Sequence, residues 1–80
     1  FNPYIKATYS FPYKAKVEIT ISDILGRKVR TFHGSDHALG EKDIIWDGKD
    51  QNGRMLGTGV YYLNLSTTDY SKTIKIVMLK

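Results

Sequence analysis

Apolar and polar residues alternate along much of this chain with a period of two. Residues 4–11 place apolar side chains at every second position, and residues 16–23 repeat the pattern. An amphipathic helix would instead place its apolar residues three and four positions apart, so this spacing predicts β-strands. Pro12 marks the end of the first strand, because proline lacks the N–H that a strand donates to its neighbour.

Turn-forming residues divide the chain into about seven extended segments. The further strands are predicted at residues 28–32, 41–47, 54–56, 59–66 and 71–80. Segment 59–66 is apolar on both faces, which predicts a central strand, whereas residues 33–39 are predicted to form a polar loop. This pattern predicts an all-β, immunoglobulin-like sandwich of about seven strands in two antiparallel sheets. A small closed barrel is the alternative, and no internal repeat is evident.

The predicted core is thin, because a chain of 80 residues buries only about 60% of the surface that its unfolded form exposes. No cysteine is present to add a disulfide. The residues predicted to be largely buried are Ile19, Ile21, Val29, Trp46, Val60, Tyr62 and Ile74. Trp46 has a second interpretation as a sugar-stacking platform with Tyr61 and Tyr62, although a core role is favoured.

Composition limits the partners that we expect. The net charge is +4, but the basic residues are scattered, so no nucleic-acid partner is expected. No apolar run approaches the roughly 18 residues of a membrane span, so no direct membrane insertion is expected. The sequence opens at Phe1 without a methionine or a signal peptide, and we interpret it as part of a longer protein.

No group of residues points to catalysis or to a zinc site. The chain has no thiol nucleophile, its serines lack a nucleophile-elbow motif, and Glu18 and Glu41 form no evident acid–base pair. His33 and His37 are four residues apart, but they fall in the predicted loop and lack the further ligands that zinc needs. We therefore expect neither an enzyme nor a cofactor.

The segment 47–53 resembles a calcium loop. Aligning Gly53 with the glycine at the sixth position of such a loop places Asp50 at the third. The match fails at the first and twelfth positions, Gly48 and Gly59, where ligating side chains are required. The favoured interpretation is a tight turn in which Asp50 caps backbone amides and Gly53 has a positive φ, with calcium binding left open.

The last predicted strand, residues 71–80, contains an almost unbroken apolar run. The run comprises Ile74, Ile76, Val77, Met78 and Leu79. An exposed strand of this kind can pair with another chain and serve as a recognisable handle. An ordinary buried closing strand fits the composition equally well.

Five motifs follow one another along the chain. They are Phe1-Asn2-Pro3 with Tyr9-Ser10-Phe11-Pro12, Asp23-Ile24-Leu25-Gly26-Arg27-Lys28-Val29, Trp46-Asp47-Gly48-Lys49-Asp50-Gln51-Asn52-Gly53, Gly57-Thr58-Gly59-Val60-Tyr61-Tyr62 and Lys75-Ile76-Val77-Met78-Leu79-Lys80. In this order they resemble the type A C-terminal sorting domain of proteins exported by the type IX secretion system of Bacteroidetes-like bacteria. Ser22 and Leu39-Gly40 depart from that family's pattern.

The resemblance implies that residues 1–80 form a single non-catalytic domain that directs an upstream cargo domain to the cell surface or beyond it. The implied route runs through the periplasm and the outer membrane, and the implied partners are the outer-membrane translocon, its shuttle proteins and a sortase-like protease. The implied recognition signal is Lys75, Ile76, Val77, Met78, Leu79 and Lys80. The implied structural motif is Gly26, Trp46, Asp47, Gly48, Asp50, Gly53, Gly59 and Tyr61.

Another family shares the central motifs. The immunoglobulin-like domain of the flagellar hook-capping protein also carries W-D-G-x-D-x-x-G followed by G-x-Y, and in that protein the domain is structural. The ending at Lys80 favours the sorting interpretation. The remaining interpretation, a carbohydrate-binding accessory module of a secreted enzyme, would need an exposed strip of aromatic side chains.

Overall fold

The computed structural model describes residues 5–11, 15–37 and 40–79, and every regular element within them is a β-strand. The strands are β1 (Ile5–Phe11), β2 (Ala15–Asp23), β3 (Lys28–His37), β4 (Gly40–Trp46), β5 (Gly59–Ser66) and β6 (Ser71–Met78). Within these ranges no helix is long and apolar enough to cross a membrane. The predicted motif residues 1–3, Pro12 and Lys80 lie outside the described residues.

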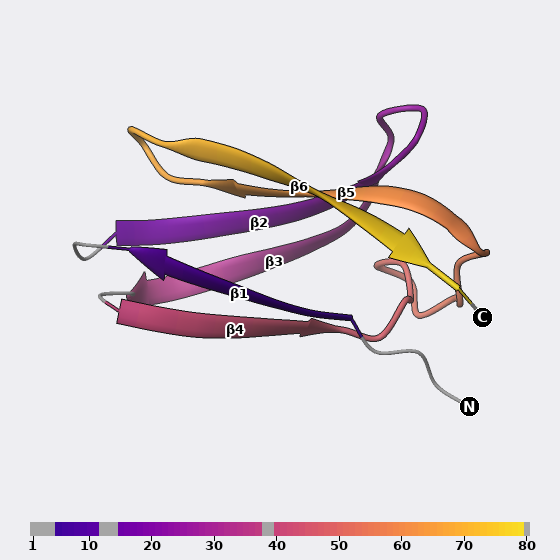
Figure 1. Cartoon of the computed structure of the whole chain (residues 1–80), viewed down its shortest axis with the longest axis horizontal. Coiled ribbons are helices and arrows are strands. Elements are labelled where there is room, and N and C mark those ends of the chain that lie inside the picture. The colour runs from indigo at the N-terminus through magenta and orange to yellow at the C-terminus, as the bar shows by residue number, and fades with distance from the viewer. Residues whose placement is uncertain (1–4, 12–14, 38–39, 80) are drawn as a thin grey trace.

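The strands form two antiparallel sheets that lie face to face (Figure 1). β1 pairs with β4 in a two-stranded sheet, and the other sheet has the order β3-β2-β5-β6. The two separate sheets confirm the predicted immunoglobulin-like sandwich over the barrel alternative. β5 lies between β2 and β6, as its apolar residues on both faces predicted.

The core lies between the sheets, and alternate residues of the two interior strands, β2 and β5, form its largest part. The register of β2 against β5 sets Ile19 beside Leu65 and Ile21 beside Leu63, and all four side chains are buried. Because side chains on a strand alternate between its faces, these partners all point into the same layer. The other buried hydrophobic residues are Val17, Trp46, Tyr61, Ile76 and Met78.

Two predictions about individual segments are wrong. Residues 33–37 belong to β3 and are not a loop, because they pair with β2 through backbone groups that are independent of side-chain polarity. Tyr62, predicted to be buried, is 36% exposed, and its neighbour Tyr61, at 8%, takes the inward position. Three other predicted core residues are only half-buried: Val29, Val60 and Ile74.

The chain reverses direction twice at one end of the sandwich. Figure 1 shows the β2–β3 connection and the β4–β5 connection at the same end, which we call the turn end. The strand predicted at residues 54–56 is reduced there to a single bridge between Lys49 and Met55. The turn end therefore holds two of the central sequence motifs close together.

Candidate functional site

Asp23 organises the connection between β2 and β3. Its Oδ1 accepts hydrogen bonds from the backbone N–H groups of Leu25 and Arg27, both at 2.9 Å, and its Oδ2 accepts one from Arg27 Nε at 2.9 Å. The Asp23 N–H donates to the Arg27 carbonyl at 2.9 Å, and the Gly26 N–H donates to the Asp23 carbonyl at 3.0 Å. Gly26 has a φ of +84°, a left-handed conformation that other residues adopt only at a cost.

Asp50 makes the same set of contacts in the connection between β4 and β5. Its Oδ1 accepts hydrogen bonds from the N–H groups of Asn52 and Arg54, both at 2.9 Å, and its Oδ2 accepts one from Arg54 Nε at 3.3 Å. The Asp50 N–H donates to the Arg54 carbonyl at 2.8 Å, and the Gly53 N–H donates to the Asp50 carbonyl at 3.0 Å. Gly53 has a φ of +85°.

These two connections share one sequence pattern, Asp-x-x-Gly-Arg, and one conformation. We call residues 23–27 the first turn and residues 50–54 the second turn. The shared Asp, Gly and Arg are visible in the sequence as Asp23-Ile24-Leu25-Gly26-Arg27 and Asp50-Gln51-Asn52-Gly53-Arg54. Because the aspartate and the glycine fix the backbone, the two middle positions are free to carry different side chains.

Hydrogen bonding lowers the pKa of both turn aspartates below the ordinary range. The largest cause is the backbone N–H of Arg27 for Asp23 and the backbone N–H of Arg54 for Asp50. Each donor stabilises the ionised carboxylate over the protonated acid. Both turns are therefore held by charged carboxylates at neutral pH.

Trp46 joins the second turn to the core. Its side chain is 1% exposed, and its ring packs edge to face against Tyr61 with the centroids 5.4 Å apart. Its Nε1–H donates to the Lys49 carbonyl at 2.9 Å, so the buried indole has a hydrogen-bond acceptor. This burial confirms the core role of Trp46 and overturns the sugar-stacking alternative.

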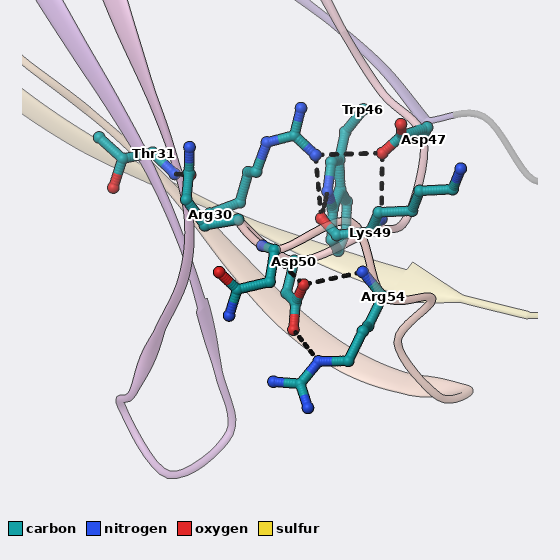
Figure 2. Close-up of polar contacts among 9 residues, drawn as sticks. Arg30, Thr31, Trp46, Asp47, Lys49, Asp50 and Arg54 are labelled. Carbon is teal, nitrogen blue, oxygen red and sulfur yellow. Dashed lines mark hydrogen bonds and ion pairs between the residues drawn. The ribbon is translucent and has the colours of Figure 1, made fainter.

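Arg30 of β3 reaches across to the start of the β4–β5 connection, as Figure 2 shows. Its Nη1 donates to Asp47 Oδ1 at 3.2 Å and to the Lys49 carbonyl at 3.1 Å. The guanidinium also lies 4.7 Å from the centroid of the Phe32 ring. Since β3 and β4 belong to different sheets, these bonds join the two layers at the turn end.

Gln51 provides another link between the second turn and β3. Its Oε1 accepts a hydrogen bond from the Thr31 N–H, and its own N–H donates to the Val29 carbonyl, both at 2.9 Å. The side chain at the second position of this turn thus has a structural use. The second turn is held by its own carboxylate, by Trp46 and by β3.

The carboxylate that suggested a calcium loop is occupied by donors from the protein. Both oxygens of Asp50 accept N–H groups, which favours the turn interpretation of segment 47–53. Gly48 has a φ of +80°, and its carbonyl accepts the Leu56 N–H at 2.9 Å. Among the side chains that the structure describes, no three His, Asp or Glu residues come together, and those of His33 and His37 are not among them.

A shallow cavity of about 300 Å³ opens at the turn end. Its lining includes Ile24 and Leu25 of the first turn, Leu56 and Thr58 of the β4–β5 connection, and Val60 and Tyr61 of β5. The charged groups at its rim, Asp23 and Arg27, are bonded to each other. The cavity thus offers both apolar and polar contact surface, and its described lining holds no acid–base pair suited to catalysis.

β6 is the closing strand of its sheet. It pairs with β5 along its whole length, and Ile76 and Met78 are buried in the core. Lys75, Val77 and Leu79 alternate with them on the exposed side. Two of the residues that the type IX resemblance assigned to translocon recognition, Ile76 and Met78, are therefore part of the core.

Comparison with known proteins identifies relatives of this fold. The model of the FlgD Ig-like domain family matches residues 5–71. The structure of FlgD from P. aeruginosa superposes with a TM-score of 0.76 and 27% identity, covering 91% of this chain and 56% of that one. FlgD from Xanthomonas campestris, whose hook capping is described as essential for flagellar assembly, superposes with a TM-score of 0.71 and 27% identity. The superposition covers 92% of this chain and 54% of that one. The chain spans about half the length of both, and no curated protein matches it.

These matches overturn the type IX sorting interpretation, together with the translocon, shuttle and protease partners predicted from it. The error has a physical cause. The motifs that carried the resemblance encode an aspartate cap, a glycine with positive φ and a tryptophan anchor. These features build the turn end, so they predict the fold of the domain and not the route by which the protein is exported. The match over residues 5–71 shows that the chain belongs to the FlgD Ig-like domain family.

Proposed function

We propose that this chain is a structural, non-catalytic module of a flagellar hook-capping type protein. The observation that carries the proposal is the family match over residues 5–71, supported by two FlgD structures that share the fold over nine-tenths of the chain. On this proposal the module works outside the cell, where the hook is assembled. Its partners are other proteins of the growing flagellum and the remaining part of its own polypeptide.

The construction of the turn end supports a scaffold role. The described polar groups there bind one another: two aspartates hold their own turns, Arg30 joins the sheets and Trp46 bonds to the Lys49 carbonyl. None of the buried side-chain nitrogen or oxygen atoms in the described residues lacks a partner. Such an arrangement suits a rigid body that presents a surface to other subunits.

The proposal is tested by exchanging domains in FlgD of P. aeruginosa. The matching immunoglobulin-like segment is replaced by this chain in a strain that lacks its own FlgD, and hooks are counted by electron microscopy beside a swimming assay. We expect hooks to form. A chimera with an unrelated immunoglobulin-like domain of similar size is the control and should form none.

A chimera carrying Trp46→Ala tests whether the fold is needed, and it should also form no hooks. Each chimera is checked for secretion into the medium by immunoblot. The proposal is contradicted if the chimera with this chain is secreted and folded but behaves like the unrelated domain.

A further inference from the structure

The first turn carries two large apolar side chains into solvent. Ile24 is 70% exposed and Leu25 is 74% exposed, although apolar side chains of this size are usually turned inward. Figure 1 shows this connection standing out from the sandwich on the side away from β1 and β4. No other described residue of this chain covers most of their surface.

The second turn is an internal control for this observation. It has the same backbone and the same aspartate and arginine contacts, yet its two middle positions hold the polar residues Gln51 and Asn52. The conformation therefore does not require apolar residues at these positions. The presence of apolar side chains at Ile24 and Leu25 therefore has to be explained by something other than the conformation of the turn.

The apolar surface continues from the first turn onto the outer face of the four-stranded sheet. Ile24 and Leu25 line the cavity of about 300 Å³ together with Val60. Val60 is paired with Val77 of β6, which is 58% exposed. We call Ile24, Leu25, Val60 and Val77 the end patch.

A row of residues with positive charge at both of its ends borders the end patch. The strand register sets Lys28, Ser22, Tyr62 and Lys75 side by side across β3, β2, β5 and β6. Both lysines are exposed. The nearby acid, Asp23, already has both oxygens occupied by Arg27 and Leu25. The surroundings of the end patch are therefore positive, with no free carboxylate of Asp23 to neutralise them.

We propose that the end patch is a docking surface for a protein segment that presents aliphatic side chains flanked by aspartate or glutamate. The aliphatic groups would enter the cavity beside Ile24 and Leu25, and the carboxylates would pair with Lys28 and Lys75. Apolar burial supplies most of the affinity of such contacts, and charge complementarity selects the partner. This inference goes beyond the hook-cap assignment, because it rests on the surface alone.

The test uses the isotope-labelled chain and a synthetic peptide of alternating leucine and glutamate. Binding is measured by titration calorimetry and mapped by amide chemical shifts. We expect saturable binding, with the largest shifts in the first turn and at Val77. Peptides of alternating leucine and lysine, or of alternating serine and glutamate, are the matched probes and should bind much more weakly.

The decisive variant is Ile24→Gln with Leu25→Asn. It gives the first turn the same sequence as the second, Asp-Gln-Asn-Gly-Arg, so the fold should be retained. The peptide should bind at least about tenfold more weakly, the loss expected when an interface anchor is removed. Ile45→Gln removes an exposed apolar side chain of β4, outside the end patch, and should leave the affinity unchanged.

Several results would overturn the proposal. These are an absence of binding up to the solubility limit of the peptide, unchanged affinity in the double variant, or shifts centred away from the end patch. A dimer seen by sedimentation that the double variant dissolves would assign the end patch to a copy of this chain instead. Failure of the hook chimera alone would leave this result standing, so the two proposals fail separately.

Discussion

The first turn and the second turn have the same backbone and different surroundings. Both are closed by an aspartate, a glycine near φ +85° and an arginine at the fifth position. The second turn is also joined to the core by Trp46 and to β3 by Gln51. The first turn stands out from the sheet, and Ile24, which occupies the position equivalent to Gln51, is exposed. The comparison shows that Asp-x-x-Gly-Arg determines a conformation and leaves the use of the turn to its middle residues.

The largest expected effect comes from removing the anchor that only the second turn has. Trp46→Ala should lower the free energy of unfolding by about 3–5 kcal/mol, because it leaves a large cavity and removes the bond to the Lys49 carbonyl. Chemical denaturation measures this loss. Trp46→Phe, which keeps a ring but loses the N–H, should be clearly less damaging, and equal losses in the two variants would contradict the role of the indole bond.

A medium effect is expected from the two glycines, and it should be equal in the two turns. Gly26→Ala and Gly53→Ala should each lower the free energy of unfolding by roughly 1–2 kcal/mol, the cost of placing a side chain in a left-handed conformation. An added Cβ meets no atom within 4 Å at either site, so no clash adds to this cost. Denaturation curves that differ strongly between the two variants would show that the turns are not equivalent.

A smaller effect should separate the equivalent positions Gln51 and Ile24. Gln51→Ala removes the acceptor for the Thr31 N–H and should cost about 0.5–1.5 kcal/mol. Ile24→Ala should change the free energy of unfolding by less than about 0.5 kcal/mol, because the side chain is mostly in solvent. Hydrogen exchange at the Thr31 amide should accelerate only in the first of these variants.

The smallest effect is expected from acid, which acts on the carboxylates of the two turns. The pKa of Asp23 and of Asp50 is lower in the folded chain than in the unfolded chain, with the backbone N–H groups of Arg27 and Arg54 as the largest causes. Their contribution to stability is therefore present above about pH 4 and is lost as the pH falls through the lowered folded values.

Substitution isolates this acid effect. Asp23→Asn and Asp50→Asn should each lower the melting temperature at neutral pH, and the difference from the unsubstituted chain should shrink in acid. Thermal denaturation across a pH series measures it. A difference that grows as the pH falls would contradict the assigned direction of the pKa change.

The sequence predicted the architecture well, because apolar residues alternate in β1 and β2 and the apolar run of β5 indicates an interior strand. It misplaced residues 33–37, since these polar residues pair with β2 through backbone groups, which every residue type carries. It chose Tyr62 over Tyr61 for the core, since two adjacent tyrosines give no period. The inward position of Tyr61 follows from the packing of its ring on Trp46 and its hydroxyl bond to the Gly57 carbonyl at 2.7 Å.

The candidate site was less predictable than the fold. The aspartates and glycines of both turns are visible as turn signals, but Arg30 and Gln51 act across long sequence separations that no local pattern reveals. The family assignment failed for a related reason. Motifs that specify a turn occur in domains with different functions, so they do not distinguish between the two families that share them.

The bonds from Arg30 to Asp47 and to the Lys49 carbonyl affect how tightly a ligand can be held. They fix the distance between the first turn and the second turn before any partner binds. A molecule that contacts both would meet a surface whose conformational entropy was already lost during folding, so little further ordering would oppose association. Replacing Arg30 should therefore lower the affinity for a molecule that contacts both turns.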